Sequence, residues 1–305
     1  MVKLNARLVL LLTLPPLLWA GNAVVGRLMV GQVPPLALNA MRWVLASLLL
    51  LPLGWRAIAT PAARAQIAQR WPELALLSFL GVGCYNSLQY LALTTSTPLN
   101  VTLIAASMPL WMMGIGAVFY QVRPRGREWL GAALSLGGVL VVLSRGSVAA
   151  LARVHFVTGD LLMLLAVMSW AFYSWLLARP PKSMRGEARP GWNWAELLLV
   201  QTLFGSAFGA TAASAEFALT GATVHWSPGV AVALLYVAVG PSVIAYRCWG
   251  QGVTLVGPAV AAFFSNLTPL FAAVLSAAML GEAPQPYHGV AFALIVAGIA
   301  VSSRR

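Results

Sequence analysis

Charged side chains are scarce in this chain. Only 9% of its 305 residues are charged, only 7 are Asp or Glu, and 60% are hydrophobic, which gives a mean hydropathy of +0.83. A soluble domain carries about 25% charged residues. This chain has too few water-compatible side chains to cover its own surface, so the composition predicts a protein embedded in a lipid bilayer.

Cysteine and histidine are also rare, and their positions argue against disulfides and metal sites. Cys84 and Cys248 both fall in apolar runs, where they are expected to pack as small buried hydrophobic side chains. The 3 histidines, His155, His225 and His288, are scattered over loops and segment ends and form no zinc-like cluster. The sequence therefore predicts no metal and no cofactor.

Motifs typical of other functions are missing as well. No Gly-rich loop ending in Lys-Ser/Thr is present, so ATP is not the direct energy source, and no nucleophile–base pair suggests an enzyme. The net charge of +12 would suggest nucleic-acid binding in a soluble protein. Here the basic residues lie mostly between apolar runs, so the expected partner is the lipid bilayer and no nucleic acid is predicted.

Long apolar runs fill most of the chain. A helix needs about 20 apolar residues to cross the hydrocarbon core, and ten segments of roughly this length can be laid out, five in each half. The runs lack the inside–outside alternation of a barrel, so we expect helices. The ten predicted spans are Leu8–Val30, Pro34–Gly54, Pro72–Leu93, Thr97–Tyr120, Trp129–Ser144, Phe156–Ala178, Ala195–Leu219, Gly229–Trp249, Gly257–Leu280 and Tyr287–Ser303.

Basic residues favour one side of the predicted membrane. With the N-terminus placed in the cytoplasm, the opposite side keeps only Arg145 and Arg153 outside the spans. Cytoplasmic loops of membrane proteins are enriched in Lys and Arg, so both termini are predicted to be cytoplasmic. The residues on the cytoplasmic side are Lys3, Arg7, Arg56, Arg64, Arg70, Arg123, Arg125, Arg127, Arg179, Lys182, Arg185, Arg189, Arg304 and Arg305.

The two halves of the chain repeat one another at a distance of 160 residues. Thr94, Pro98, Pro109, Leu110, Ala117, Leu134 and Gly138 recur as Thr254, Pro258, Pro269, Leu270, Ala277, Leu294 and Gly298. Each half has an odd number of spans, so the second copy must be inverted, and equivalent loops indeed have opposite charge bias. The predicted fold is an all-α membrane protein of two inverted five-helix repeats, residues 1–150 and 151–305.

A series of motifs resembles the EamA-type branch of the drug/metabolite transporter superfamily. One departure is that Gln121 and Arg123 stand where many relatives have an acidic residue, a feature that only Glu282 keeps. The overall pattern is similar to YddG-type amino-acid exporters of bacterial inner membranes, so the resemblance implies metabolite export, in particular of amino acids. The motifs are Trp19-Ala20-Gly21-Asn22, Pro34-Pro35-Leu36, Arg42-Trp43, Thr94 to Pro109, Gly131, Gly138, Trp170-Ala171-Phe172-Tyr173, Asn266 to Pro269 and Gly281-Glu282.

Prolines inside two predicted spans mark candidate hinges. Pro109 and Pro269 each remove one helical hydrogen bond and so free a backbone carbonyl oxygen. Such a backbone group is tolerated inside a membrane only where it is buried in protein or lines a water-filled cavity. One interpretation is a polar site at the midplane with a hinge for rocking, and the other is a kink that only shapes packing. Pro98 and Pro258, the other repeated pair, are included among the gating candidates.

Aromatic and polar residues in the middle of spans are the candidate cavity residues. Aromatic rings accept apolar and aromatic side chains by stacking and an ammonium group by cation–π attraction, although ordinary helix packing explains each ring as well. Polar groups deep in the membrane hydrogen-bond a substrate or tie helices together. Arg42 holds a substrate carboxylate, snorkels toward the interface or bonds backbone carbonyls. The candidates are Trp19, Asn22, Arg42, Tyr85, Gln89, Ser107, Trp111, Trp170, Tyr173 and Asn266.

Together these features predict an exporter of the bacterial inner membrane, functional as a monomer, that works by alternating access between the repeats. Aromatic and other apolar amino acids are the favoured substrates. No Asp or Glu lies at the centre of a span, which disfavours proton coupling, because a buried titratable group usually carries the proton. The alternative is an exporter of other small metabolites or drugs, including one that works by proton-coupled antiport.

Overall fold

The computed structural model describes residues 5–96, 98–147, 155–280 and 285–303, and every regular element in these ranges is a helix. The first half contains α1 (Ala6–Leu28), α2 (Pro35–Gly54), α3 (Arg56–Ala59), α4 (Pro61–Gln69), α5 (Trp71–Ser78), the π-helical η1 (Phe79–Cys84), α6 (Tyr85–Ala92), α7 (Pro98–Ala106), α8 (Met108–Tyr120) and α9 (Gly126–Leu143). The second half contains α11 (Thr158–Ala178), two 3₁₀ turns, η2 (Lys182–Met184) and η3 (Gly186–Ala188), α12 (Trp194–Thr220), α13 (Pro228–Val237), the π-helical η4 (Ala238–Ile244), α14 (Ala245–Val256), α15 (Pro258–Ser265), α16 (Leu267–Leu280) and α17 (Pro286–Ser303).

The predicted ten spans are confirmed. Within the described residues, 9 helices are long and apolar enough to cross a membrane, and the bent pair α7–α8 makes the tenth span. Predicted and observed boundaries agree within a few residues for nine of the ten. The eighth span is longer than predicted, because α13, η4 and α14 continue as one helical span from Pro228 to Val256, and Gly257 ends it with a positive φ of 88°.

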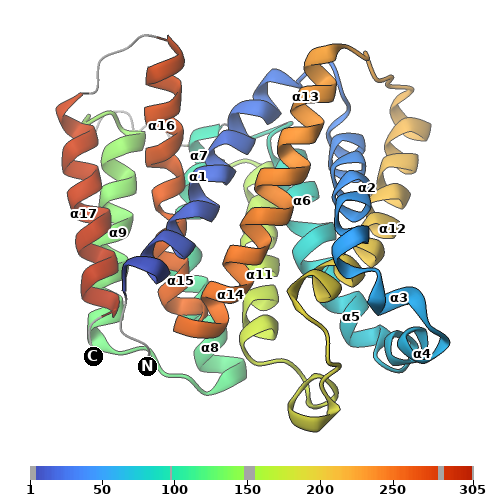
Figure 1. Ribbon diagram of the computed structural model, residues 1–305. Coiled ribbons are helices and arrows are strands. Elements are labelled where there is room, and N and C mark those ends of the chain that lie inside the picture. The colour runs from blue at the N-terminus through green and yellow to red at the C-terminus, as the bar shows by residue number, and fades with distance from the viewer. Residues whose placement is uncertain (1–4, 97, 148–154, 281–284, 304–305) are drawn as a thin grey trace.

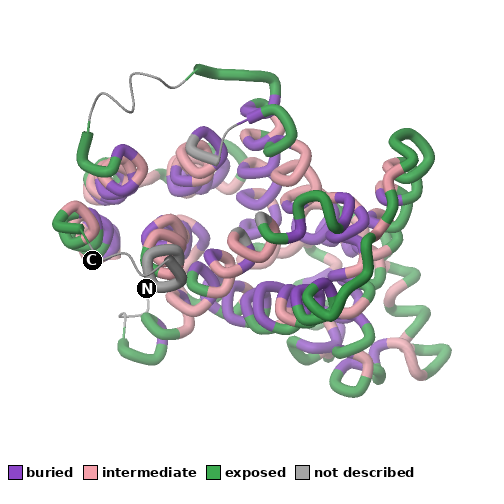
Figure 2. The backbone as a smooth tube through the Cα atoms, turned by 90° about the horizontal axis from the view of Figure 1, so that it is seen from above, coloured by how far each residue is buried: buried purple, intermediate pink, exposed green. Residues whose placement is uncertain are grey.

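Helices of the first repeat pack against helices of the second, in two cases at equivalent positions (α2 with α12, and α9 with α17) and in two cases as a first span against a third span. α2 lies beside α12, α9 beside α17, α6 beside α11, and α1 beside α14 (Figure 1). Because each half has five spans, the two copies cross the bilayer in opposite directions. Seen from above, the buried residues face the inside of the bundle and the exposed residues face its periphery (Figure 2). The fold is therefore the predicted pair of inverted repeats, and the 150/151 boundary between them falls in the undescribed segment 148–154.

Small residues explain the close contact of α9 with α17. A Cβ atom on Gly131 would lie 2.8 Å from the carbonyl oxygen of Gly298, and one on Gly298 would lie 2.7 Å from the carbonyl oxygen of Gly131. At Gly138 a Cβ would lie 2.7 Å from the side chain of Ile295. Close backbone approach through glycine is the usual way in which membrane helices associate, so the repeated glycines have a structural reason.

The loops on one side of the bundle bind each other. Arg70, which follows α4, donates to the carbonyl oxygens of Ser183 (2.9 Å) and Ala188 (2.8 Å), and Ser183 donates to Glu73 (2.8 Å). These contacts join the loop after the second span to the loop after the sixth span. The two loops therefore share one face, as the alternation of basic loops requires, and the first of them forms the short helices α3 and α4, which were not predicted.

The π-helical segments occupy equivalent positions in the two repeats. A shift of 160 residues moves Phe79–Cys84 onto 239–244, which lies within η4. A π segment breaks the regular i→i−4 hydrogen bonding, and such segments are frequent at functional sites. The sequence did not predict them. They leave carbonyl oxygens in the third and eighth spans that distant side chains use, as described below.

Candidate functional site

A cavity of about 140 Å³ lies between the two repeats. One water needs roughly 10–15 Å³ on this scale, so the space holds several waters or a small ligand. Both halves contribute to it. The lining residues are Trp19, Asn22, Tyr85, Asn86, Gln89, Val101, Thr102, Ala105, Ala106, Met108, Trp170, Tyr246, Ser265, Asn266, Thr268, Pro269 and Ala272.

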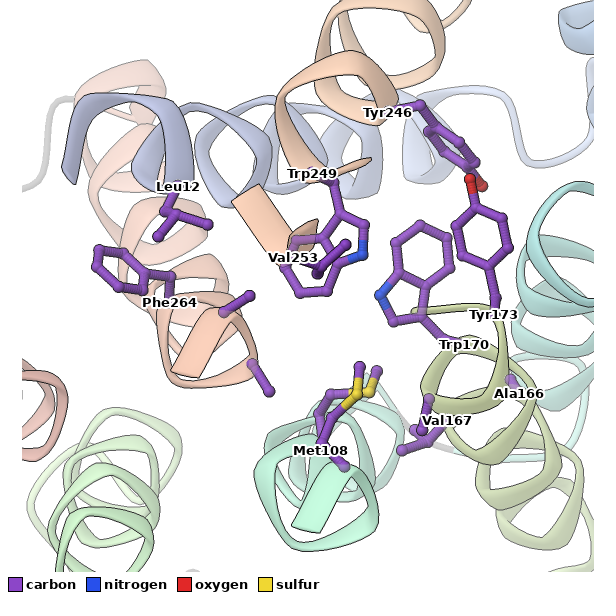
Figure 3. Close-up of a cluster of buried hydrophobic side chains, with 14 of the residues drawn as sticks. Leu12, Met108, Ala166, Val167, Trp170, Tyr173, Tyr246, Trp249, Val253 and Phe264 are labelled. Atoms are coloured by element: carbon purple, nitrogen blue, oxygen red, sulfur yellow. The ribbon is translucent and has the colours of Figure 1, made fainter. Parts of the chain in front are cut away.

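The cavity lies nearer to one end of the bundle. On α1, its lining residues are Trp19 and Asn22 in the second half of the helix, and on α6 the cavity extends to Gln89, near the helix end. The other end is filled with buried apolar side chains from both repeats, including Leu12, Val253 and Phe264 (Figure 3). The structure is therefore closed at the end where α1 begins.

Six of the ten predicted cavity residues line this space, and they come from four different spans. They are Trp19, Asn22, Tyr85, Gln89, Trp170 and Asn266. The other four, Arg42, Ser107, Trp111 and Tyr173, are absent from the wall. The structure thus brings the two repeats together around most of the predicted set, while their binding of a substrate stays a prediction.

Trp170 is the centre of an aromatic cluster beside the cavity. Edge-to-face and tilted ring pairs at these separations attract one another beyond their simple burial. The cluster fixes the rings that form the apolar wall. The centroid of Trp170 lies 5.0–5.6 Å from the ring centroids of Trp19, Tyr85, Tyr173, Tyr246 and Trp249. Figure 3 shows Trp170 with Tyr173, Tyr246 and Trp249 around it.

Tyr173 and Tyr246 fix this cluster through hydrogen bonds of their hydroxyl groups. Tyr173 is buried and donates its hydroxyl to Gln201 at 3.0 Å, so it supports Trp170 without reaching the cavity. Tyr246, which lines the cavity, donates to the carbonyl oxygen of Gly81 at 2.6 Å, inside the π segment η1. The predicted site residue Tyr173 therefore supports the wall, and Tyr246 was missing from the predicted set.

Arg42 is fully buried on α2 beside the cavity. Its guanidinium donates to the hydroxyl of Ser242 (2.7 Å), the side-chain oxygen of Asn22 (3.3 Å) and the carbonyl oxygen of Pro241 (3.4 Å). It also lies 5.0 Å from the ring of Trp43. None of these partners is acidic, so the positive charge is solvated by neutral groups. Pro241 and Ser242 belong to η4, so a π segment again supplies the acceptors.

Asn266 lies at the junction of α15 and α16, at the bottom of the cavity wall formed by the second half. It is 1% exposed, and its Nδ2 donates to Ser135 on α9 at 2.8 Å. Within the described residues its Oδ1 has no hydrogen-bond partner, and neither has the hydroxyl of Ser265 beside it. Buried polar atoms nearly always have a partner, so two unsatisfied atoms in a cavity wall indicate a place for a ligand or water.

The two proline breaks are built differently. α7 and α8 meet at Ser107 with a bend of 42°, whereas α15 and α16 pass as one span from Pro258 to Leu275. Ser107 donates to the carbonyl oxygen of Ile104 (2.6 Å), which explains why it is turned to the backbone and away from the cavity. The bend confirms a kink in the first half, while hinge motion at Pro109 or Pro269 stays a prediction.

The other gating candidates and Trp111 have plainer positions. Pro258 is the first residue of α15 and Pro98 the first of α7, a place where proline fits because its missing N–H would have no helical partner. The side chain of Pro98 lies outside the described residues. Trp111 packs half-buried against the core on α8. Neither Pro258 nor Trp111 is among the described lining residues of the cavity.

Buried acidic groups lie at helix starts and not in the cavity. Asp160 accepts hydrogen bonds from Ser96, from Asn100 (2.9 Å) and from the backbone N–H of Val157 (2.7 Å) at the beginning of α11. Glu196 accepts from the backbone N–H of Asn193 (2.6 Å) at the beginning of α12. Carboxylates at helix N-termini are stabilised by the helix dipole. Among the described lining residues there is no Asp or Glu.

Comparison with known proteins gives a consistent result. The model of the EamA-like transporter family matches twice, over residues 6–144 and 157–304. An uncharacterized transporter of Archaeoglobus fulgidus is 26% identical over 304 residues, 99% of each chain. The uncharacterized transporter YyaM of Bacillus subtilis is 24% identical, covering 90% of this chain and 86% of its own. The uncharacterized inner membrane transporter YedA of Escherichia coli is also 24% identical, covering 92% and 85%.

A solved crystal structure shares the fold. It is 22% identical to this chain, and the two superimpose with a TM-score of 0.75 over 98% of each chain. None of the names of these relatives states a substrate. The likeness to YddG-type exporters that the sequence suggests therefore stays a prediction.

Proposed function

Since this chain belongs to the EamA-like transporter family, matched over both of its halves, we propose that it exports amino acids from the bacterial cytoplasm. The chain is a multi-pass membrane transporter, and the proposal concerns its substrate, direction and energy source. Aromatic and other apolar amino acids are the preferred substrates. The protein works as a monomer by alternating access, without ATP.

The observation that carries the substrate proposal is the wall of the cavity. Trp19, Tyr85, Trp170 and Tyr246 give it aromatic faces, and Asn22 and Asn266 give it polar groups at separate points. Small-molecule sites are typically apolar pockets with a few placed polar groups. An amino acid with an apolar side chain matches such a pocket, because its side chain stacks on the rings while its polar groups reach the amides.

The direction proposal rests on the charge pattern and on the end at which the bundle is closed. With the termini in the cytoplasm, the apolar plug around Leu12, Val253 and Phe264 closes the cytoplasmic side. The cavity then lies in the outer half of the membrane, which corresponds to the outward-facing stage of an export cycle. The inward-facing stage requires these side chains to separate.

The energy source follows from the acidic residues. Asp160 and Glu196 are bonded to helix starts, and the described wall of the cavity has no carboxylate that could carry a proton. We therefore expect facilitated diffusion down the amino-acid gradient. Proton-coupled antiport of drugs or other metabolites is the alternative outcome of the test below.

The test uses the purified protein in liposomes. Vesicles loaded with labelled phenylalanine, leucine or another apolar amino acid are diluted into buffer of the same pH, and the efflux of label is followed. Efflux is expected to be faster than from vesicles that contain the same label but no protein. No flux for any amino acid would overturn the substrate proposal, and flux only under a pH gradient would overturn uniport. Phe79, on an exposed lipid-facing position, offers a control substitution, F79L, against Tyr85→Leu in the wall, which is expected to slow efflux.

A further inference from the structure

Two regions of the cavity wall differ in the hydrogen-bonding groups that they present to a ligand: one presents a donor, and the other presents acceptors. On α1, Asn22 lines the cavity and is bonded to the guanidinium of Arg42. At the junction of α15 and α16, Ser265 and Asn266 line it with atoms that accept hydrogen bonds. The two regions come from different repeats, and α1 packs against both α15 and α16, so they face a common space.

The region around Asn22 is a donor with a positive charge behind it. The side-chain oxygen of Asn22 accepts from Arg42, which leaves the Nδ2 group of Asn22 to donate toward the cavity. The described contacts of Arg42 include no carboxylate, so its charge is not neutralised by the protein. Burial of an uncompensated charge is costly. An anionic group of a ligand would bond Asn22 and offset that charge.

The region at the helix junction has two oxygen atoms that can accept a hydrogen bond, the hydroxyl of Ser265 and the amide oxygen of Asn266, and the amide oxygen can only accept. The Oδ1 atom of Asn266, a residue that is 1% exposed, has no partner within the described residues, and neither has the hydroxyl of Ser265. The Nδ2 atom of Asn266 donates to the hydroxyl of Ser135. In this orientation of the amide, the Oδ1 atom is the one that remains to accept a hydrogen bond. An ammonium group supplies three N–H donors and no acceptor, which is what this region lacks.

We infer that the cavity binds its substrate as a zwitterion, with the carboxylate at Asn22, where the charge of Arg42 lies behind the wall, and the ammonium at Ser265 and Asn266. The inference rests on the proposed function and names the chemical groups through which that site selects amino acids. The aromatic wall around Trp170 then receives the side chain. The two polar regions select for the carboxylate and ammonium groups of an amino acid, and the aromatic rings accept side chains of different shapes.

The experiment compares an amino acid with analogues that lack one of its charges. Phenylalanine is tested against phenethylamine, which has no carboxylate, and 3-phenylpropionate, which has no ammonium. Leucine, 3-methylbutylamine and 4-methylpentanoate form a second set with another side chain. Binding to the purified full chain and competition with labelled efflux from liposomes are measured. A site built to bond a polar group rejects an analogue without it by a large factor, so roughly 100-fold weaker competition is expected for both analogues.

Two substitutions test the regions separately. Asn22→Leu removes the donor but leaves Arg42 bonded to Ser242 and Pro241, so folding should be retained, and the preference for phenylalanine over phenethylamine should shrink. Asn266→Asp keeps the size of the side chain and adds a negative charge. It should strengthen phenethylamine binding by about tenfold, because hydrogen bonds between charged groups are the stronger ones. Gln251→Glu, at an exposed position outside the cavity, adds the same charge and should change neither ratio.

The outcomes separate the two proposals. If phenylalanine or leucine is transported but both analogues compete equally well, amino-acid export stands and the zwitterion site is wrong. The inference also fails if N266D leaves the amine preference at the wild-type ratio, or if Q251E shifts it as much as N266D does. If no amino acid binds or moves, the proposed function itself is wrong.

Discussion

The helix breaks of the two repeats differ although their prolines match. α7 and α8 bend by 42° at Ser107, whereas α15 and α16 run on as one span through Asn266. The hydroxyl of Ser107 donates to the carbonyl oxygen of Ile104 in its own repeat. Asn266 donates to Ser135 in the other repeat, and its side-chain oxygen has no partner in the part of the chain that the structure describes. The repeated residues thus set the framework, and the residues that differ beside them set the chemistry.

The same contrast holds for the π segments. Both repeats have one at the same position, and each gives carbonyl oxygens to side chains from elsewhere in the chain. Gly81 in η1 accepts from Tyr246, whereas Pro241 in η4 accepts from Trp19 and Arg42. The π segment of the first repeat therefore fixes the ring of Tyr246 in the cavity wall, and that of the second repeat fixes the ring of Trp19 and the guanidinium of Arg42. Symmetry of the backbone and asymmetry of the site are compatible because they depend on different residues.

The largest effect is expected where the repeats are alike. Gly138→Leu and Gly298→Leu should both abolish the folded protein, because each forces a side chain into the neighbouring helix, where a Cβ alone already lies 2.7 Å from another atom. Overpacking in a close interface typically costs about 1–3 kcal/mol or more. The measurement is the yield of monodisperse protein in detergent and its thermal midpoint.

Gly137→Leu is the matched control, since nothing lies within 4 Å of a Cβ at that position. It should leave yield and thermal midpoint near those of the unsubstituted chain. Unequal behaviour of the Gly138 and Gly298 variants would show that the α9–α17 contact is less symmetric than the backbone suggests.

A smaller and unequal effect is expected at the prolines. Pro109→Ala should reduce the bend between α7 and α8 and lower the transport rate by about tenfold, because proline disfavours a continuous helix by roughly 3 kcal/mol and alanine restores it. Pro269→Ala should do less, since α15 and α16 already run as one span. The measurements are efflux from liposomes and the distance between spin labels on α7 and α8.

Equal losses of transport in the two proline variants would contradict a functional difference between the breaks. An unchanged label distance in the Pro109 variant would show that surrounding packing, and not the proline, holds the bend. Yield in detergent serves as the control for folding in both cases.

The smallest effect concerns the bond between Tyr246 and η1. Tyr246→Phe leaves the carbonyl oxygen of Gly81 without its donor at 2.6 Å and should lower the unfolding free energy by about 1–3 kcal/mol. Tyr236→Phe is the comparison, because its bond to the carbonyl oxygen of Leu18 is longer, 3.2 Å, and only part-buried. Thermal midpoints in the same detergent are measured, and a larger loss for Tyr236→Phe would count against the role given to the π carbonyl.

Much of the fold followed from the sequence because apolar length and loop charge act locally. The spans could be placed to within a few residues, since a run such as Pro34–Gly54 has no alternative to a helix in lipid. Inversion followed from an odd number of spans per repeat. The π segments and the extension of α14 to Val256 could not be predicted, because π bonding has no residue signature that distinguishes Phe79–Cys84 from ordinary helix.

The site was predicted in part for a similar reason. Trp19, Asn22 and Asn266 were found because polar and aromatic residues at depth are conspicuous in an apolar span. Tyr173 and Arg42 were conspicuous in the same way, but the sequence does not give the rotation of each helix. Helix packing turns Tyr173 behind Trp170 and Arg42 behind Asn22.

The sequence by itself determined the membrane location, the number of spans and the repeat, because these depend on hydropathy, length and charge counted along the chain. Only the tertiary structure decided which polar atoms are bonded and which are left over. Arg42 is solvated by residues about 200 positions away, and among the described residues Asn266 is bonded through only one of its two polar side-chain atoms. Whether a polar atom finds a hydrogen-bond partner depends on the distances between spans, and these are set by the packing of the folded bundle.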